Sequence, residues 1–475
     1  MKANALQGLA PKNLVLHDAF EALLQAGISR LRTACGNVQG EKVEVAAHIS
    51  RKLPMPPGFA FPTMWLREQL RMTPKQKCVL DNLESLKQLP EYSHLLKVIE
   101  SDILLSKQIG RNVGTALMYG FVPADDVVRR LILTATEDGS TLVFSSDTFE
   151  SQYRTLENAC YSDTIPVTTV VPLYGLAAPN EPIHLTTEAE IDALSDEETG
   201  RCLDANILPR VFPDTPFVSV EANLKCLRIR AEMKKMVDMS GDDRAQYRPE
   251  ARAFREKVHD RVDEVLRVLR IFKRGSVSPA TFLHHSPHFF LHGRYAWTHS
   301  AVRPDVWPQE RLQLSISEIS EFTQFCKAAE RAKTKKFLDN ALRRFGYAGD
   351  RHRADDKLVD LMISAESLFL SDSGEPKERG EMRYRLAQRA AVFIDHPTYT
   401  RKQLQKYFRG AYDARSSIVH GETPKDLHAP EGESLTLPQF TEATEQLMRA
   451  ALKKAVSIIN AEGSLRNWDD LVLGS

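Results

Sequence analysis

Two residues near the carboxyl end of the chain, Arg415 and His420, are of types that could act together on a phosphate. They lie in the segment TRKQLQKYFRGAYDARSSIVHG, where apolar residues recur at helical intervals: Leu404, Phe408, Ala411 and Ile418. Arg415 falls in the same stripe, so the predicted helix turns a permanently charged guanidinium inward. Because burying an unpaired charge is costly, we expect Arg415 to meet a carboxylate, line a polar cleft or bind an anion.

His420 directly precedes Gly421, whose position predicts the residue that ends this helix. The carbonyl end of a helix suits a cationic imidazole that acts as a general acid. In an ideal helix Arg415 and His420 are about 7.5 Å apart along the axis and about 140° apart around it, a separation that a long Arg side chain can bridge. The pair could then cleave RNA without a metal. The 2′-hydroxyl attacks its own phosphate, the guanidinium stabilises the added negative charge, and the imidazole protonates the leaving 5′ oxygen.

Other side chains in the same region could support this chemistry. Glu366 lies on the edge of an apolar stripe, where a carboxylate needs a cationic partner. It either orients Arg415 or moves a proton, or it forms a structural pair with another arginine such as Arg389. Candidate RNA-binding residues are Arg401, Lys402, Lys406, Arg409, Tyr412 and Ser416. A solvated helix face and a packed ring would explain the same residues without RNA.

A His-rich segment, TFLHHSPHFFLHG, has to be weighed separately. His288 and His292 have the i, i+4 spacing of a metal-binding pair, but no Cys lies near them. We therefore expect a packed loop and no metal. The chain has no phosphate-binding glycine motif, no G-x-S-x-G elbow and no H-E-x-x-H pair. We accordingly expect no cofactor.

The residues from about 315 to 460 predict helices throughout. Three helix starts are marked by a hydroxyl residue followed three positions later by Glu or Gln: Ser315 with Glu318, Thr400 with Gln403, and Thr436 with Gln439. Amphipathic stripes separated by short polar connections predict an antiparallel helical bundle that begins near residues 309–313.

The remainder of the chain divides into two regions. Residues 1–125 are expected to be mostly helical, with a helix over Asn13–Thr33, a break at Pro54–Pro62 and helix-forming sequence again from Leu66. Residues 126–310 are expected to mix α and β structure. Short β-branched runs, LILTATEDGSTLVF, IPVTTVVPLYGL and IHLTTEAEIDAL, predict strands, and the first contains a hairpin turn at residues 137–140. A helix is expected around Arg252–Lys273.

Composition limits the class of protein. The 475 residues carry 63 Lys and Arg against 63 Asp and Glu, which argues against a uniformly basic protein. From Lys327 to His420 there are 20 basic and 13 acidic residues, an excess of 20 − 13 = +7, so a basic segment is attached to an acidic remainder. Six scattered cysteines, without a C-x-x-C motif, predict unpaired thiols in a reducing cytosol. No secretion signal or membrane span is predicted.

Three segments in order resemble the Apea-like branch of the HEPN (higher eukaryotes and prokaryotes nucleotide-binding) domains. They are RFGYAGDRHRADDKLVDLMISAESLFL, EMRYRLAQRAAVFI and YDARSSIVHG, and the resemblance covers about residues 312–460. It implies a helical bundle that dimerises, with the R-x4-H motifs of two protomers facing one cleft, and an endoribonuclease activity found in toxins and antiphage effectors. Arg415 and His420 match that motif, whereas Ser416 stands where many catalytic members have Asn or Asp.

The expected fold class is an α+β multidomain protein. Mixed α/β and helical N-terminal regions precede a C-terminal all-α HEPN helical bundle at residues 311–465. The expected function is that of a cytoplasmic, metal-independent endoribonuclease in antiphage defence or abortive infection, with Arg415, His420 and Glu366 in its site. Its partners would be RNA, such as tRNA, a second copy or larger assembly, and a phage-derived trigger or an antitoxin. The alternative is a non-catalytic HEPN module that binds a nucleotide or a partner within a defence or toxin–antitoxin complex.

Overall fold

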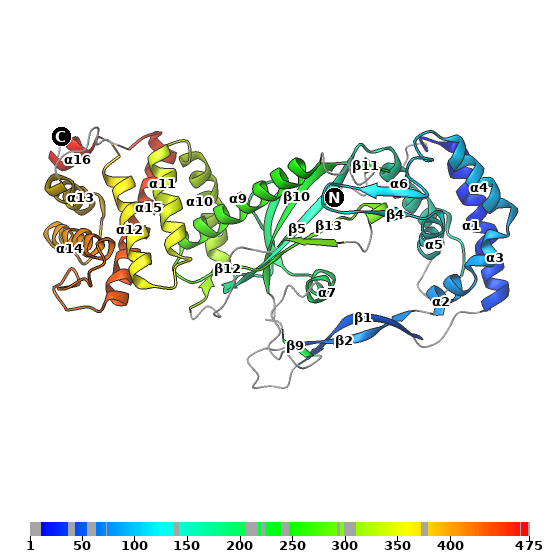
Figure 1. Cartoon of the computed structure of the whole chain (residues 1–475), viewed down its shortest axis with the longest axis horizontal. Coiled ribbons are helices and arrows are strands. Elements are labelled where there is room, and N and C mark those ends of the chain that lie inside the picture. Colours follow the sequence, from blue (N-terminus) through cyan, green and yellow to red (C-terminus); the bar gives the residue numbers. More distant parts are fainter. Residues whose placement is uncertain are drawn as a thin grey trace.

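The computed structural model describes residues 11–36, 43–54, 63–72, 74–136, 142–204, 217–219, 224–238, 247–291, 295–298, 310–371, 379–465 and 467–473. The described part is elongated (Figure 1). Helices of the amino-terminal part lie at one end, a mixed sheet lies in the middle, and a helical bundle forms the other end. The expected mixture of α and β structure is confirmed. Assignment of the bundle to the HEPN fold stays a prediction.

The amino-terminal end is built mainly from helices around one hydrophobic core. α1 (Leu14–Cys35) begins at Asn13, whose side chain accepts a hydrogen bond from the backbone N–H of Leu16. The helices that share its core are α2 (Pro74–Asp81), α3 (Leu83–Lys87), α4 (Pro90–Ser101), α5 (Ala124–Thr134) and α6 (Ser146–Tyr161). A small sheet adjoins them, formed by β3 (Arg111–Gly114), β4 (Tyr119–Val122) and β11 (Met236–Val237). Helices on both sides of residue 125 thus share a core, and the boundary predicted there stays a prediction.

A long antiparallel hairpin replaces the helical sequence that we expected to resume at Leu66. Its strands, with a third that pairs with the second, are β1 (Val43–Pro54), β2 (Thr63–Met72) and β9 (Phe217–Ser219). The register shifts between Val45 and His48, so an irregularity interrupts the period-two alternation of β1. The helix prediction was wrong for residues 66–72, where helix-favouring Leu, Arg, Glu and Gln stand in strand β2, and helix begins at Pro74.

The central sheet has the strand order β14-β13-β5-β10-β8-β7, and each neighbouring pair is antiparallel. Its strands are β5 (Thr164–Tyr174), β7 (Ile183–His184), β8 (Ala189–Ala193), β10 (Lys225–Lys234), β13 (Phe282–His285) and β14 (Tyr295–Thr298). Short strands at its margin are β6 (Leu176–Ala177), β12 (Ser278–Pro279) and β15 (Leu312–Gln313). The strands predicted in IPVTTVVPLYGL and IHLTTEAEIDAL are therefore confirmed.

Two local predictions in this region are wrong. Residues 131–134 end helix α5 and do not form a strand, because Val127, Val128, Leu131 and Ile132 turn one helical face into the core. Thr136 and Phe144 form an isolated antiparallel bridge, and the turn expected between them lies outside the described residues. The His-rich segment, expected as a loop, begins with strand β13, which hydrogen-bonds to β5.

Helix α9 (Arg248–Phe272) joins the central sheet to the bundle (Figure 1). The helix predicted around Arg252–Lys273 is thus confirmed. At one end Phe254 contacts the His284 ring of β13, and at the other Phe272 contacts the Phe322 ring of the bundle. A single hydrophobic cluster runs from the sheet through α9 into the bundle, so these parts share one core.

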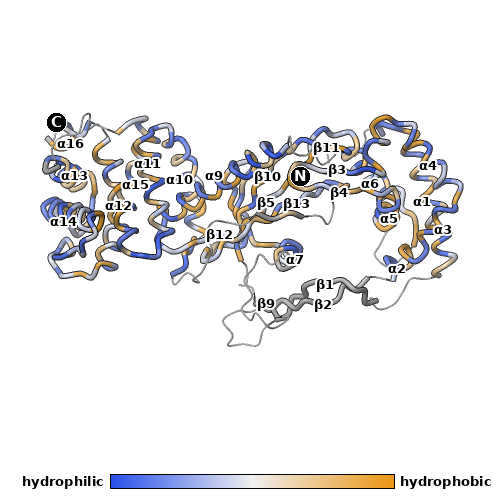
Figure 2. Tube along the Cα trace, in the orientation of Figure 1, coloured by the Kyte–Doolittle hydropathy of each residue, from blue (hydrophilic) through white to orange (hydrophobic). Residues whose placement is uncertain are grey.

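The regular elements described in the carboxyl-terminal bundle are helices, as predicted, and an isolated bridge joins His428 and Ser434 in the connection before the last long helix. A 3₁₀ turn, η3 (Ile316–Glu318), precedes α10 (Ile319–Ala332), α11 (Lys336–Ala348), α12 (Ala354–Phe369), α13 (Arg379–Phe393), α14 (Arg401–Val419), α15 (Leu437–Glu462) and α16 (Trp468–Leu473). All three predicted capping boxes are confirmed. Figure 2 shows hydrophobic and hydrophilic positions alternating along most of these helices, while α14 is largely hydrophilic. None of the helices in the described parts of the chain is long and apolar enough to cross a membrane.

Two of the six cysteines form a disulfide, so the prediction that all six are unpaired is wrong. Cys35 at the end of α1 is bonded to Cys78 of α2. The two residues are 43 positions apart in sequence, and only the packing of α1 beside α2 brings them together. The free cysteines are Cys160, Cys202, Cys226 and Cys326.

Candidate active site in the C-terminal bundle

Helix α14 carries the candidate residues, and its position is fixed by capping and by packing. Thr400 and Gln403 form the capping box that begins the helix. The hydroxyl of Tyr407 donates to the backbone carbonyl of Phe440, 2.9 Å away, and lies 2.8 Å from the Thr444 hydroxyl of α15. Leu404, Phe408 and Ala411 are buried in the same core. The first half and the middle of α14 are thereby held against the rest of the bundle.

Arg415 lies beside Glu366 of α12, with 3.7 Å between its Nη2 and the Glu366 Oε2. Both side chains are 26% exposed, so the pair lies at the edge of the core. Burial raises the pKa of the Glu366 carboxyl, and the charge of Arg415 opposes this rise. The Nε of Arg415 is buried and has no hydrogen-bond partner among the described residues. A guanidinium with one weak ion pair and one free donor retains capacity for an anionic ligand.

The alternative partner weighed for Glu366, Arg389, is engaged elsewhere. Its Nη1 donates to the backbone carbonyl of Phe369, 2.8 Å away, and its guanidinium lies 5.6 Å from the centre of the Trp468 ring. Arg389 therefore joins α13 to the ends of α12 and α16. The ion pair of Glu366 is made with Arg415 across α12 and α14.

His420 is the C-cap residue of α14 and is exposed. The backbone N–H of Gly421 donates to Ile418 and that of Glu422 donates to Ser417, at 3.0 and 2.8 Å. Gly421 has φ +79°, a left-handed conformation that completes this helix ending. The predicted helix end is confirmed. Within the described chain no hydrogen bond or ion pair holds the His420 imidazole, so it is available to a ligand.

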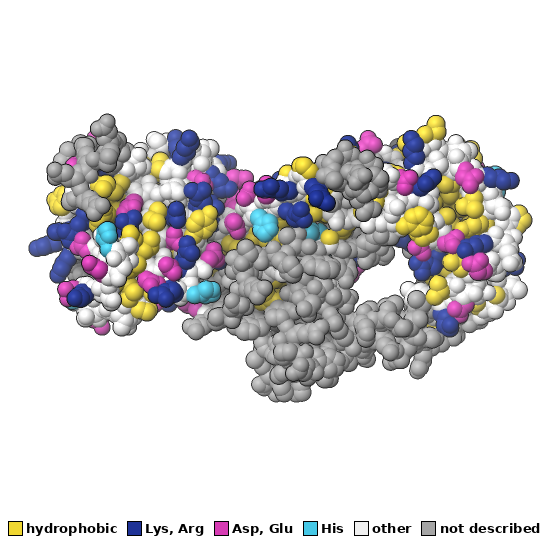
Figure 3. All heavy atoms as spheres, viewed as in Figure 1, with side chains coloured by type: hydrophobic (Ala, Val, Ile, Leu, Met, Phe, Trp, Pro, Cys, Tyr) yellow, Lys and Arg dark blue, Asp and Glu magenta, His cyan; other side chains and the backbone are white. Residues whose placement is uncertain are grey.

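The predicted RNA-binding residues divide into two groups. Arg401, Lys402, Lys406 and Arg409 are exposed along the first half of α14. Basic side chains gather at the bundle end of the molecule in Figure 3. Tyr412 and Ser416 are partly buried, and Tyr412 packs against the core. The basic residues thus form a solvated face on the helix that also carries Arg415.

One ion pair near the site was missed by sequence reasoning. Arg383 of α13 bonds to Asp413, which precedes Arg415 by two positions on α14. It joins the two helices beside the candidate site. Opposite charges on two separate helices gave no sequence signal, because their pairing depends on how α13 packs against α14.

The histidines of the central sheet are structural. His284 is fully buried, and its Nδ1 lies 2.9 Å from the Thr169 hydroxyl. Burial lowers the pKa values of His284 and His288 to about 4, so both rings are neutral at pH 7. His292 lies outside the described residues, so the spacing of His288 and His292 stays untested. Within the described ranges, potential metal ligands come together at His17, Asp18 and Glu21, where the Nε2 of His17 is already 2.6 Å from Glu150.

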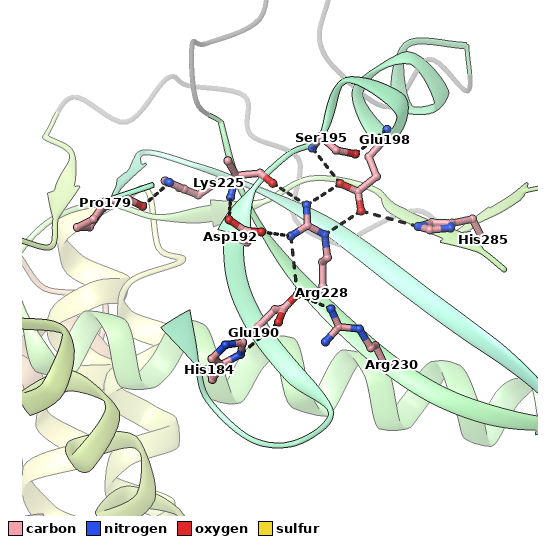
Figure 4. Close-up of polar contacts among 11 residues, drawn as sticks. Pro179, His184, Glu190, Asp192, Ser195, Glu198, Lys225, Arg228, Arg230 and His285 are labelled. Carbon is pink, nitrogen blue, oxygen red and sulfur yellow. Dashed lines mark hydrogen bonds and ion pairs between the residues drawn. The ribbon is translucent and has the colours of Figure 1, made fainter. Parts of the chain in front are cut away.

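A second charged cluster, also missed, anchors α7 (Asp196–Asp204) to the sheet (Figure 4). Arg228 of β10 donates from Nε and Nη2 to Glu198, at 2.8 and 2.7 Å, and from Nη1 to Asp192 at 2.7 Å. Burial alone would raise the pKa of Glu198, but the hydrogen bonds from Arg228 and from the backbone N–H of Ser195 hold it well below its ordinary value. Because the charges satisfy one another, this cluster is structural.

A cavity of about 430 Å³ lies where α9 meets β8, β10 and the α10–α11 region. Its charged lining residues are largely paired with one another, for example Arg267 with Asp339 and Lys333 with Glu264. Neither Arg415 nor His420 lines it.

No protein-family model, curated protein or solved structure matches this chain. Function therefore has to be argued from the candidate site itself. Arg415 lies in the last turns of α14 beside the half-buried carboxylate of Glu366, and His420 caps the same helix, whose first half carries a basic face. This set of groups can neutralise a phosphate and transfer a proton to or from an oxygen atom.

Proposed function

We propose that the chain is a metal-independent endoribonuclease whose C-terminal bundle cleaves RNA through Arg415 and His420. The observation that supports this most is the placement of Arg415 at the end of α14 beside Glu366, with one buried donor unpaired and an exposed His420 five residues on. The resemblance to Apea-like HEPN domains gives the same two residues. Under this proposal the N-terminal parts restrain the nuclease until a trigger such as phage infection, and the active form is a dimer or a larger assembly.

The chemical roles follow from the residue types. Arg415 neutralises the scissile phosphate as the 2′-hydroxyl attacks and a fifth oxygen adds negative charge. His420 transfers a proton to the departing 5′ oxygen. Glu366 keeps the guanidinium of Arg415 in place, and the basic face of α14 binds the RNA backbone without reading its sequence.

An alternative function is binding without turnover, in which the bundle holds a nucleotide or a partner chain. Two observations favour it. The described residues give His420 no group that orients its imidazole, and Ser416 replaces the Asn or Asp of many catalytic HEPN members. The RNA cleavage test below separates the two functions.

The decisive test is cleavage of total RNA by purified protein in the presence of EDTA. We expect His420→Ala to reduce the cleavage rate by about 100-fold or more, because a general acid is lost. Arg415→Ala should cause a loss of about 100-fold, because a cationic stabiliser of the transition state is lost. Rates would be followed on a labelled RNA under single-turnover conditions, and light scattering would report the oligomeric state.

Matched controls come from the same bundle. His428 is an exposed histidine eight positions after His420, and Arg353 is an arginine whose side chain is 76% exposed. His428→Ala and Arg353→Ala should cleave at the wild-type rate. Cleavage that needs added metal, or that survives in both site variants, would refute the proposal. RNA binding without cleavage by the wild type would favour the binding module.

A further inference from the structure

We propose that Cys35 and Cys78 form a reversible thiol–disulfide exchange site. Through it, a thiol reductant removes the crosslink between α1 and α2 and so loosens the strand pair β1–β2, here called the arm, whose two ends join these helices. The co-reactant is a low-molecular-weight or protein dithiol, or a disulfide such as oxidised glutathione. This inference is independent of the proposed RNA cleavage.

The bond can be reached by a reductant from one side. Cys35 is partly exposed at the end of α1, whereas Cys78 is buried at 6% exposure. The side-chain amide of Asn82 donates toward both sulfur atoms, at 3.5 Å from Cys35 Sγ and 4.0 Å from Cys78 Sγ. A donor beside the sulfurs stabilises the thiolate that exchange must release.

The other four cysteines are poorly suited to exchange. Burial raises the pKa of the Cys160, Cys226 and Cys326 thiols to about 12 and raises that of Cys202 as well. These groups are protonated at neutral pH, and exchange requires a thiolate. Of the six cysteines, Cys35 and Cys78 are therefore the ones suited to thiol–disulfide exchange.

The position of the bond gives it a mechanical consequence. The disulfide closes the segment that contains both strands of the arm, so it fixes the end of the arm that leaves α1 and returns to α2. At its other end the arm pairs with β9 and contacts α7 (Figure 1). Helix α7 is in turn anchored to the central sheet by Arg228 (Figure 4). Opening the bond removes the crosslink between α1 and α2, so the two ends of the arm, which stay joined to these helices by the backbone, are held together only by non-covalent contacts.

A dithiol reduces the Cys35–Cys78 bond in two exchange steps. A thiolate of the dithiol bonds to Cys35 Sγ, the Cys35–Cys78 bond breaks, and Cys78 leaves as a thiolate that takes up a proton. The second thiolate of the reductant then attacks the first, forming its own disulfide and releasing Cys35 as a thiolate that is protonated. The reductant loses two electrons and two protons, and the protein gains them.

The first measurement is a count of reactive thiols in full-length protein. Wild type treated with oxidised glutathione, then denatured and alkylated, should show four modified cysteines: Cys160, Cys202, Cys226 and Cys326. Native protein treated with excess dithiothreitol beforehand should show all six. Six modified cysteines in the oxidised sample, or four after native reduction, would overturn the proposal.

The second measurement tests the arm. Reduction of wild type should speed limited proteolysis between β1 and β2 several-fold and lower the melting temperature by about 5 °C or more. Cys35→Ser should have the proteolysis rate and melting temperature of reduced wild type, with or without reductant. Cys326→Ser, the control, should change on reduction as much as wild type does. Equal cleavage rates and melting temperatures for oxidised and reduced wild type would show that the bond does not control the arm.

Discussion

At the scale of single residues, the environment of Glu366 decides the state of the candidate site. Its carboxyl is removed from water at the core edge and faces one guanidinium at 3.7 Å. Burial raises its pKa above the ordinary 4.5, and Arg415 does not fully offset that rise. The ion pair is therefore a weak stabiliser of the fold.

The sign of the pH effect follows from this shift. The pKa of Glu366 is higher in the folded than in the unfolded state, so its neutral carboxyl favours the folded state. This contribution to the free energy of unfolding is complete below the ordinary pKa of 4.5 and is lost as pH rises through the raised pKa. Glutamine does not titrate, so Glu366→Gln does not lose this stability as pH rises. At pH 7 we expect its free energy of unfolding to match or exceed that of wild type, by less than about 1 kcal/mol.

Cleavage by Glu366→Gln should nevertheless fall about two- to fivefold, because Arg415 loses a charged contact worth up to about 1 kcal/mol. Urea unfolding and the RNA assay would be run on the same samples. Glu84→Gln, at a side chain that is 82% exposed, is the control and should change neither quantity. A large loss of stability in Glu366→Gln would instead assign Glu366 to the fold.

At the scale of elements, α14 depends on how it begins and how it ends. Its capping box and the turn at Gly421 set the length of the helix and so the position of His420. Two glycines of this segment differ in backbone conformation and therefore in whether they tolerate a side chain. Gly421 has φ +79°, while Gly410 lies within the helix and has open space around an added methyl group.

Alanine at these two glycines should change stability in opposite directions. Gly421→Ala should lower the free energy of unfolding by about 1 kcal/mol, because alanine is strained at positive φ. Gly410→Ala should raise it by about 0.5–1 kcal/mol, because alanine favours the helix. Chemical denaturation followed by circular dichroism would measure both. A loss at Gly410 would mean that this face of α14 is covered.

The basic face of α14 makes a second prediction at this scale. Replacing Lys402 and Lys406 by Gln should weaken RNA binding about equally for all sequences. Each replacement should reduce the slope of log affinity against log salt by roughly 0.7, the value for one single-strand phosphate contact. Filter binding at several salt concentrations would measure the slope. A normal slope in the double variant would place the RNA elsewhere.

At the scale of the whole molecule, two features join its parts. One hydrophobic core runs from the central sheet through α9 into the bundle, and Arg270 of α9 donates to the backbone of Gly346 and Val277. On the other side of the sheet, Arg228 holds α7 by its bonds to Glu198 and Asp192 (Figure 4). A displacement of the central sheet would therefore also shift the bundle helices that share its core.

Removal of Arg228 tests this anchoring. Arg228→Met should lower the free energy of unfolding by about 3–5 kcal/mol, because Glu198 is left buried without its cation. The depressed pKa of Glu198 gives stability that is present above its ordinary pKa and is lost in acid, so the gap between the proteins should narrow as pH falls. Urea unfolding at several pH values would measure this. Arg252→Met, at a pair exposed by 79% and 61%, is the control and should leave the free energy of unfolding nearly unchanged.

Local patterns in the sequence determined many elements of the bundle and some of the central sheet and α9. The capping boxes, the end of α14 before Gly421, the strands around residue 170 and the helix after residue 248 follow from spacing of a few residues, and the structure agrees. Such features depend on neighbours in the chain, so sequence alone reveals them. The types of the site residues, Arg415 and His420, were visible for the same reason.

Contacts between distant segments were decided only by the tertiary structure. The partner of Glu366, the pair Arg383–Asp413, the Arg228 cluster and the disulfide Cys35–Cys78 each join residues from separate elements. Strand β2 was mistaken for helix because its local sequence is rich in helix-favouring residues, whereas its pairing with β1 and β9 decides its conformation. The spacing of residues along the chain determines on which face of a helix or strand a side chain lies. Tertiary packing determines which groups of other elements that face contacts, and the candidate site depends on both.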